Sequence, residues 1–319
     1  GVIQRHFTED MLGHSSATVV VAGSMQVAFL NLVGSPAGIA AERFGYRVVL
    51  MAGCLLSMVG LLLASFVNAD NLWLLVLSHG ALIGSAAALL VIPLCSIPTV
   101  WFLKRRGLAN GILMAANGIS GLAFPPLMQK LIDTVGIHWT LRIFILVVAV
   151  IGGIPSWFIH ESNHASIGAK LRAVLGLVAD FSLLQNKPFI VVSILNFTSG
   201  CAFFIPYQYL PTYATRQGFT TDQAALLASL LGAGQIIGGF GGGLLMDYIG
   251  VYNLLVLVQL LSTLTPAVLW TLSQQFSVLV AFSVTYGIAS GAGVLTTGPS
   301  VAVLFDVRRV PSALGMLFL

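Results

Sequence analysis

Charged residues are scarce in this chain of 319 residues: Asp, Glu, Lys and Arg make up 8%, against 57% hydrophobic residues. Soluble globular domains contain about a quarter charged residues, so this composition excludes most soluble enzymes and binding modules. Cysteine is scarce too. Cys54, Cys95 and Cys201 lie inside apolar stretches without a C-x-x-C spacing, which favours inert buried thiols over a disulfide or a metal site.

Eight stretches of the chain lack Asp, Glu, Lys and Arg entirely. They are 11–41, 48–69, 71–103, 107–129, 143–160, 188–215, 223–246 and 248–305. About 20 apolar residues in a helix span a hydrocarbon core of roughly 30 Å. The last stretch is long enough for two helices, so the sequence predicts an all-α, polytopic transmembrane helical bundle of nine complete helices. Residues 311–319 resemble the start of a tenth helix, and no Met start or signal segment is visible, so we expect a chain shortened at both ends.

The basic residues are unevenly distributed between alternate loops. One set of loops holds Arg43, Arg47, Lys104, Arg105, Arg106, Lys170, Arg172, Lys187, Arg308 and Arg309. The other set holds Arg5, Lys130, Arg142 and Arg216. This bias predicts that the first set is cytoplasmic. Membrane lipids, and not nucleic acid, are therefore the expected partners of these cations.

The longest polar interruption divides five predicted crossings from four. We expect an N-terminal transmembrane bundle over 1–159, a cytoplasmic loop over 160–187 and a C-terminal transmembrane bundle over 188–319. Within the loop, residues 166–184 carry apolar residues at helical spacing, which suits either a helix on the membrane surface or a plain linker.

Two short loops in corresponding positions of the two halves are similar. The first contains Gly38, Glu42, Arg43, Gly45 and Arg47. The second contains Gly243, Asp247, Tyr248, Gly250 and Tyr252. Both read small-xxx-acid-x-x-Gly, and such a repetition indicates two bundles built as a parallel internal repeat.

The first loop resembles the signature G-x-x-x-D-R-x-G-x-R of the major facilitator superfamily, with Glu42 in place of its Asp. The run from Trp101 to Gly111, WFLKRRGLANG, resembles the junction of the fourth and fifth helices in the fungal, monocarboxylate-transporter-like branch. The resemblance covers essentially the whole chain. It implies a two-bundle transporter that moves a small organic solute, monocarboxylate-like or another small metabolite, by alternating access, in symport with a proton where coupling exists.

The resemblance also implies a gating role for one group of residues. The group consists of Gly38, Glu42, Arg43, Gly45, Arg47 and Asp247. Charges at a helix end can pair with a neighbouring helix terminus in one conformation and release it in another. The alternative is that these residues only anchor the topology.

Helices one, four, seven and ten line the central cavity in this family. The candidates for contact with the solute are therefore His79, Asn196, Tyr207, Gln208, Thr285 and Tyr286. Polar groups at membrane depth are costly unless paired, so hydrogen bonding between helices is the alternative role. Pro206 and Pro211 are expected to break the seventh helix and free backbone groups near Tyr207.

No Asp or Glu lies deep within any predicted span, which leaves His79 as the candidate for a coupling proton. Gln235 is the nearest polar residue to the position of the family's buried Arg. The lack of a buried cation favours a neutral or amphipathic metabolite over an acid, and no cofactor is expected.

Two other functions stay open from the sequence. His160, Glu161 and His164 form a literal H-E-x-x-H, the zinc-binding pattern of metalloproteases, although it falls in the predicted loop. A shortened relative that does not transport could instead act as a sensor or as the partner of a full-length carrier.

Overall fold

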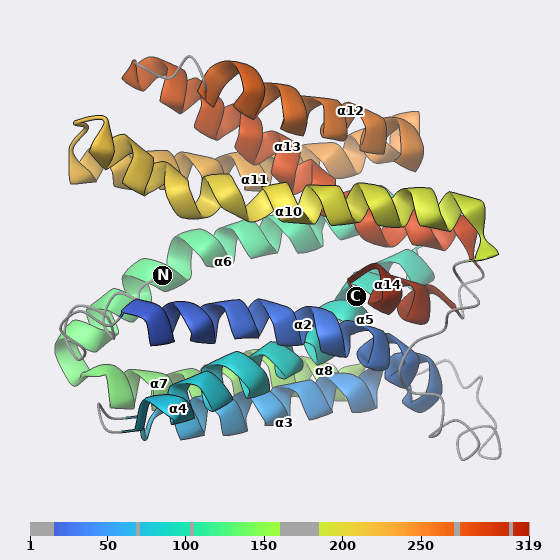
Figure 1. Cartoon of the computed structure of the whole chain (residues 1–319). Coiled ribbons are helices and arrows are strands. Elements are labelled where there is room, and N and C mark those ends of the chain that lie inside the picture. The colour runs from blue at the N-terminus through green and yellow to red at the C-terminus, as the bar shows by residue number, and fades with distance from the viewer. Residues whose placement is uncertain are drawn as a thin grey trace. The chain divides into compact units, whose positions relative to one another are not determined.

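The computed structural model describes residues 16–67, 71–102, 105–159, 185–270, 275–305 and 309–318. The regular structure of these residues is helical throughout, which confirms the all-α prediction (Figure 1). The longer helices are α2 (Ser16–Phe44), α3 (Tyr46–Ala64), α5 (Ile83–Trp101), α6 (Arg106–Val135), α7 (Ile137–Val147), α10 (Lys187–Arg216), α11 (Thr221–Ile249), α12 (Val251–Thr265), α13 (Phe276–Leu304) and α14 (Val310–Phe318). Shorter segments, with η marking π-helical turns, are α4 (Leu72–Leu75), η3 (Val76–Leu82), η4 (Val148–Gly153), α8 (Ile154–Phe158) and η7 (Pro266–Trp270).

Eight helical segments of the described chain are long and apolar enough to cross a membrane. They are Tyr46–Ala64, Trp73–Thr99, Arg106–Phe124, Lys130–Phe158, Lys187–Pro211, Asp222–Ile249, Val251–Trp270 and Phe276–Leu304. Each matches a predicted crossing, and α2, with 29 residues, occupies the remaining one. Large apolar side chains such as Leu146 and Phe197 are 66% and 72% exposed. Such exposure suits a surface that faces lipid.

The chain forms two compact units. Unit 1 contains residues 1–97, 125–183 and 307–319, and unit 2 contains residues 98–124 and 184–306. The first part of α6 thus packs with the C-terminal helices, and α14 packs with the N-terminal ones. The predicted boundaries at 159 and 188 divide the chain by its internal repeat, whereas the two units are defined by contacts. The predicted division into two bundles therefore stays a prediction. The predicted surface helix over 166–184 lies outside the described residues.

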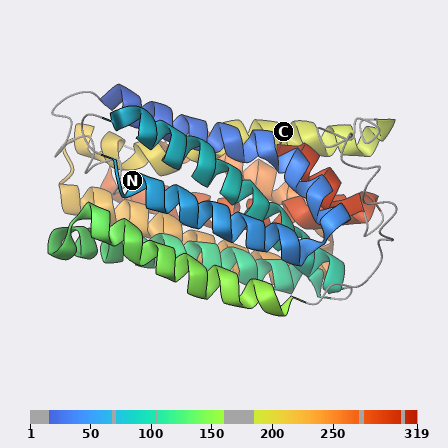
Figure 2. The ribbon, with the colours of Figure 1, turned by 90° about the horizontal axis from the view of Figure 1, so that it is seen from below.

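In unit 1, α2 packs against η3, α3 and α14, and Figure 2 shows the short red α14 beside the blue α2. Helix α2 approaches α5 closely because a small residue lies between them. A Cβ on Gly84 of α5 would lie 2.6 Å from the backbone oxygen of Gln26 of α2. Ala22, Val67, Leu75 and other apolar side chains fill the core beside this contact.

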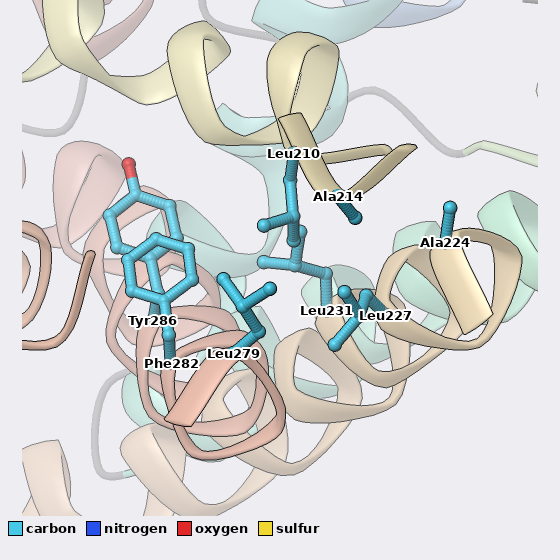
Figure 3. Close-up of a cluster of buried hydrophobic side chains, with 8 residues drawn as sticks. All are labelled: Leu210, Ala214, Ala224, Leu227, Leu231, Leu279, Phe282 and Tyr286. Atoms are coloured by element: carbon cyan, nitrogen blue, oxygen red, sulfur yellow. The ribbon is translucent and has the colours of Figure 1, made fainter. Parts of the chain in front are cut away.

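In unit 2, α11 and α13 are the most closely packed pair. A Cβ on Gly234 would lie 2.7 Å from the backbone oxygen of Val284, and one on Gly287 would lie 2.5 Å from that of Leu231. The hydrophobic effect does not drive helices together inside lipid, because lipid tails are as apolar as the side chains. Close backbone packing of this kind is therefore a main source of helix association. Figure 3 shows the neighbouring apolar cluster, in which Phe282 and Tyr286 of α13 lie side by side.

The helix that corresponds to the family's seventh does not break as expected. Helix α10 runs unbroken from Lys187 to Arg216 with Pro206 and Pro211 inside it. Backbone groups that leave a helix at membrane depth lose their hydrogen bonds, so the surroundings favour a continuous helix. The Thr215 hydroxyl donates to the carbonyl oxygen of Pro211 at 3.3 Å and supports the second of these turns.

Candidate functional site

The two similar loops have the same backbone geometry. Gly45 separates α2 from α3 with φ 88° and ψ 159°, and Gly250 separates α11 from α12 with φ 86° and ψ 160°. This region of conformational space is accessible almost solely to glycine. The glycine follows the acidic residue by three positions in both loops, so it turns the chain sharply after the carboxylate.

In the second loop, Asp247 binds the amino end of α6 within unit 2. Its Oδ1 accepts from the Gly107 N–H at 2.8 Å and its Oδ2 accepts from the Leu108 N–H at 3.1 Å. These N–H groups belong to the first turn of α6, where helix geometry leaves donors without partners. The carboxylate therefore caps the helix and complements its positive end.

In the first loop, Glu42 binds the amino end of α14 within unit 1. Its Oε1 accepts from the Ser312 N–H at 3.2 Å. Ser312 is the third residue of α14, as Leu108 is the third residue of α6. The two acids thus cap equivalent positions of two different helices.

Glycines bring each acid to the helix that it caps. A Cβ on Gly243 would lie 2.5 Å from the Gly107 oxygen, and one on Gly111 would lie 2.6 Å from the Gly239 oxygen. The equivalent close contacts in unit 1 join Gly38 to Pro311 and Gly315 to Gly34. We call Glu42 with the α2–α14 contact the first junction, and Asp247 with the α11–α6 contact the second junction.

The sequence predicted Gly38, Glu42, Gly45 and Asp247 as gating residues, but it did not identify the helix ends that they contact. One available signal was the spacing Gly-x3-Gly-x3-acid, which places both glycines and the carboxylate on one helix face. It occurs at 34, 38 and 42 and again at 239, 243 and 247.

The two arginines of the first loop have different surroundings. The Arg47 guanidinium stacks over the Trp157 ring of α8, with its Cζ 4.3 Å from the ring centroid. The Nη1 atom of Arg43 is buried and has no hydrogen-bond partner among the described residues. Arg47 therefore ties the start of α3 to a neighbouring helix by a cation–π contact.

His79 lies half-buried in the π-helical turn η3, in the first part of the span Trp73–Thr99. The neighbouring Ser78 is fully buried, and its hydroxyl donates to the Leu74 carbonyl at 2.6 Å. π-Helical turns inside α-helices are frequent at functional sites. The placement suits the proposed titratable role of His79, which stays a prediction.

In unit 2, α10 and α13 bring together two of the candidate residues, Tyr207 and Tyr286, and a third, Asn196, contacts α13 elsewhere. The Tyr207 hydroxyl lies 2.8 Å from the Ser290 Oγ, and the ring centroids of Tyr207 and Tyr286 are 6.4 Å apart. Asn196 Oδ1 accepts from the Thr297 hydroxyl at 3.2 Å, while its Nδ2 donates to the Val192 carbonyl at 3.0 Å. Asn196 thus makes an interhelical bond, the alternative role considered above.

The remaining candidates are less informative. Thr285 is exposed, and its hydroxyl donates to the Ala281 carbonyl of its own helix at 2.7 Å. Gln208 lies in α10, and its side chain is outside the described residues. The sequence reasoning missed Gln259 of α12, whose Nε2 donates to the Leu195 carbonyl at 3.3 Å and also reaches Ser199 Oγ.

The described residues contain no group of three His, Cys, Asp or Glu side chains that could hold a metal ion. The H-E-x-x-H at residues 160–164 lies outside the part of the chain that the structure describes.

Comparison with known proteins identifies the family. The sequence profile of the Major Facilitator Superfamily matches residues 4–319. The MFS transporter asaE of Aspergillus flavus is 27% identical over the whole chain, which covers 71% of that relative. The Agnestins efflux protein of Paecilomyces divaricatus is 26% identical over 99% of this chain and 71% of its own length. A crystal structure of the proton:xylose symporter XylE shares the fold with a TM-score of 0.76 at 13% identity, over 99% of this chain and 80% of that structure.

These matches agree with the eight apolar spans. They support a transporter and not an enzyme, so the metalloprotease alternative is wrong. They do not single out the monocarboxylate-like branch. The chain is a multi-pass integral membrane protein and belongs to the Major Facilitator Superfamily.

Proposed function

We propose that this protein exports a small, neutral organic metabolite by alternating access, with the first and second junctions as its gate. The direction rests on relatives named as efflux proteins, among them those for agnestins and fujikurins. The neutral charge rests on the described spans, in which Gln235 of α11 stands where an anion carrier of this family would need a cation. A monocarboxylate would leave its charge unpaired at that depth, at a high desolvation cost.

The observation that carries the gating proposal is that each acid caps a helix from the other half of the sequence. Asp247 follows the eighth family helix and holds the fifth, and Glu42 follows the second and holds the eleventh. A cap of this kind forms only while the two helix ends are together. Rocking of the halves would break both caps at once.

The size of these contacts suits a reversible gate. A carboxylate at a helix amino end contributes up to about 2 kcal/mol, so two caps would bias the closed state by at most roughly 700-fold. This bias is large enough to hold one conformation and small enough for a bound solute to offset. A proton on His79 is a further candidate for such an offset, because XylE is described as a proton symporter.

Spin-label distances in lipid nanodiscs test the gate without knowledge of the solute. Exposed Arg105 and Tyr248 report the second junction, and exposed Val48 and Arg309 report the first. We expect a short and a long distance population at each pair, and a shift toward the long one in the Glu42→Gln/Asp247→Asn double variant. A single population that the double variant leaves unchanged contradicts gating.

Export itself is tested in cells that express the chain. Untargeted mass spectrometry of the medium should find at least one neutral metabolite that accumulates with the wild type and not with the double variant. If the medium contains the same metabolites with the wild type and the double variant, and each label pair shows a single distance population, a non-transporting relative that acts as a sensor or partner is favoured instead.

A further inference from the structure

An aromatic series runs through unit 2 from α10 across α13 to η7 and back to α10. Its members are, in order of contact, Phe203, Tyr207, Tyr286, Phe282, Trp270 and Tyr213. Neighbouring ring centroids lie 5.0 to 6.4 Å apart. Such spacing is typical of stacked and edge-to-face aromatic contacts, which orient each ring relative to the next.

The series is buried on α13 and open on α10. Phe282 and Tyr286 are 0% and 3% exposed and belong to the apolar core of the unit. Phe203 and Tyr207 are half-buried, and their rings are 5.1 Å apart with only 30° between the ring planes. These two tilted rings thus present partly accessible surface, and the buried rings behind them hold their orientation.

The polar chemistry beside these two rings is sparse. The Ser290 hydroxyl donates to the Gly287 carbonyl at 2.9 Å, so the Tyr207 hydroxyl is the donor in its contact with Ser290. The Tyr207 oxygen therefore keeps lone pairs that can accept a hydrogen bond from a ligand hydroxyl or N–H.

Nearby hydroxyls are already committed to protein carbonyls. Thr198 donates to Ile194 at 2.9 Å, and Thr285 donates to Ala281 at 2.7 Å. Their protons are therefore engaged by the protein, and what these hydroxyls offer to a solute is, as for Tyr207, an oxygen that accepts.

No Asp, Glu, Lys or Arg occurs between Lys187 and Arg216 in α10, or from Phe276 to Leu304 in α13. An anionic or cationic ligand at the level of Tyr207 would therefore lose its hydration without gaining a counter-ion. The helices on both sides of the series select against charge.

We propose that α10 and α13 bind the transported solute as a neutral, planar aromatic or conjugated molecule stacked on Phe203 and Tyr207, with one hydroxyl or N–H donated to the Tyr207 oxygen. This inference rests on the proposed export function and specifies its substrate class. Planarity follows from the partly accessible aromatic rings, on which a flat skeleton can stack. Neutrality follows from the uncharged helices, and the donor group follows from the Tyr207 oxygen, which can accept.

Three probes of one carbon skeleton test these features on the full chain in lipid nanodiscs. 2-Naphthol is planar and neutral, decahydro-2-naphthol is saturated and neutral, and 2-naphthoate is planar and anionic. Calorimetric titration should give about three- to tenfold tighter binding for 2-naphthol than for the saturated alcohol, because only the planar ring can stack. 2-Naphthoate should bind at least as weakly as the saturated alcohol.

Conservative variants locate the binding. Phe203→Leu should weaken 2-naphthol binding about three- to tenfold and leave the saturated alcohol unchanged. Tyr207→Phe should weaken the binding of both alcohols, because each has a hydroxyl group that loses its acceptor. Phe305→Leu is the matched control, because it breaks the pairing of Phe305 with Phe189, centroids 5.3 Å apart, which lies outside the series.

Equal binding of the two alcohols, tight binding of 2-naphthoate, or an equal loss in Phe305→Leu would each overturn the substrate class. The distance populations at the two junctions need no probe. If they respond to the cap variants and the medium still accumulates a neutral metabolite while the probes fail, export stands and only the substrate class is wrong. If neither the distances nor the medium respond, the export proposal itself fails.

Discussion

The first and second junctions share their backbone geometry but differ in the side chains beside the acidic residue. Both place Gly-x3-Gly-x3-acid against the first turn of another helix, and both end in a glycine with φ near 87°. The positions of Arg43 and Arg47, however, are occupied by Tyr248 and Tyr252 in the second junction. The shared part is therefore the backbone contact and the carboxylate, and the cations are not required for the capped arrangement.

The last position of each loop makes the same kind of contact by different means. Arg47 stacks on Trp157, whereas the Tyr252 hydroxyl donates to the Ser300 carbonyl at 3.3 Å. Each anchors the start of the helix after the loop to another helix of its own unit. Tyr248 differs from Arg43 more strongly, since Tyr248 is 91% exposed while Arg43 has a buried nitrogen.

The largest expected effect comes from filling the backbone contact. Gly243→Val places a branched side chain where even a Cβ would meet the Gly107 oxygen, and should lower the free energy of unfolding by about 3 kcal/mol. Gly241→Val is the control on the same helix, because no atom lies within 4 Å of its Cβ. Detergent-induced unfolding measures both. A loss that is equal in the two variants would show that the contact is not tight.

The next effect concerns the glycine that closes each loop. Gly250→Ala and Gly45→Ala each force a Cβ into a conformation that costs about 1–3 kcal/mol, although nothing lies within 4 Å of a Cβ on Gly250. Because the two backbones are nearly identical, the two losses should agree within about 0.5 kcal/mol in the same unfolding assay. Clearly unequal losses would break the equivalence of the junctions.

Much of this arrangement could be predicted from local sequence, and some of it could not. Charge-free stretches located the spans, because lipid excludes unpaired charge along each helix independently of the rest of the fold. The similar loops likewise predicted Glu42 and Asp247 as a pair. The amino ends of α6 and α14 were not predicted, because the contact of Asp247 with Gly107 joins residues 140 positions apart and leaves no local pattern. The break predicted at Pro206 and Pro211 was wrong for a different reason. Proline breaks helices in water, but lipid offers no partners to freed backbone groups and so favours a continuous helix.

A smaller effect separates the two carboxylates. Asp247 uses both oxygens on α6, with the shorter contact at 2.8 Å, whereas Glu42 reaches the Ser312 N–H at 3.2 Å. Asp247→Asn should therefore shift the closed-to-open ratio at its spin-label pair by about 1.5 kcal/mol, roughly tenfold, and Glu42→Gln by about 0.5–1 kcal/mol. Asp222→Asn removes a charge from the first turn of the same α11 and should leave the ratio unchanged. The reverse order of the two cap variants would assign the stronger cap to the first junction.

The smallest effect comes from exchanging the residues in which the junctions differ. Tyr248→Arg restores the signature cation at an exposed position, and should change the unfolding free energy by less than about 0.5 kcal/mol. Arg43→Tyr replaces a side chain with a buried nitrogen and should have the larger effect on both stability and the distance populations at the first junction. If Tyr248→Arg instead raised the unfolding free energy by more than Arg43→Tyr lowered it, the cations and not the carboxylates would dominate the junctions. The expected asymmetry follows from burial, because a charge exposed to water is screened and contributes little to a contact nearby.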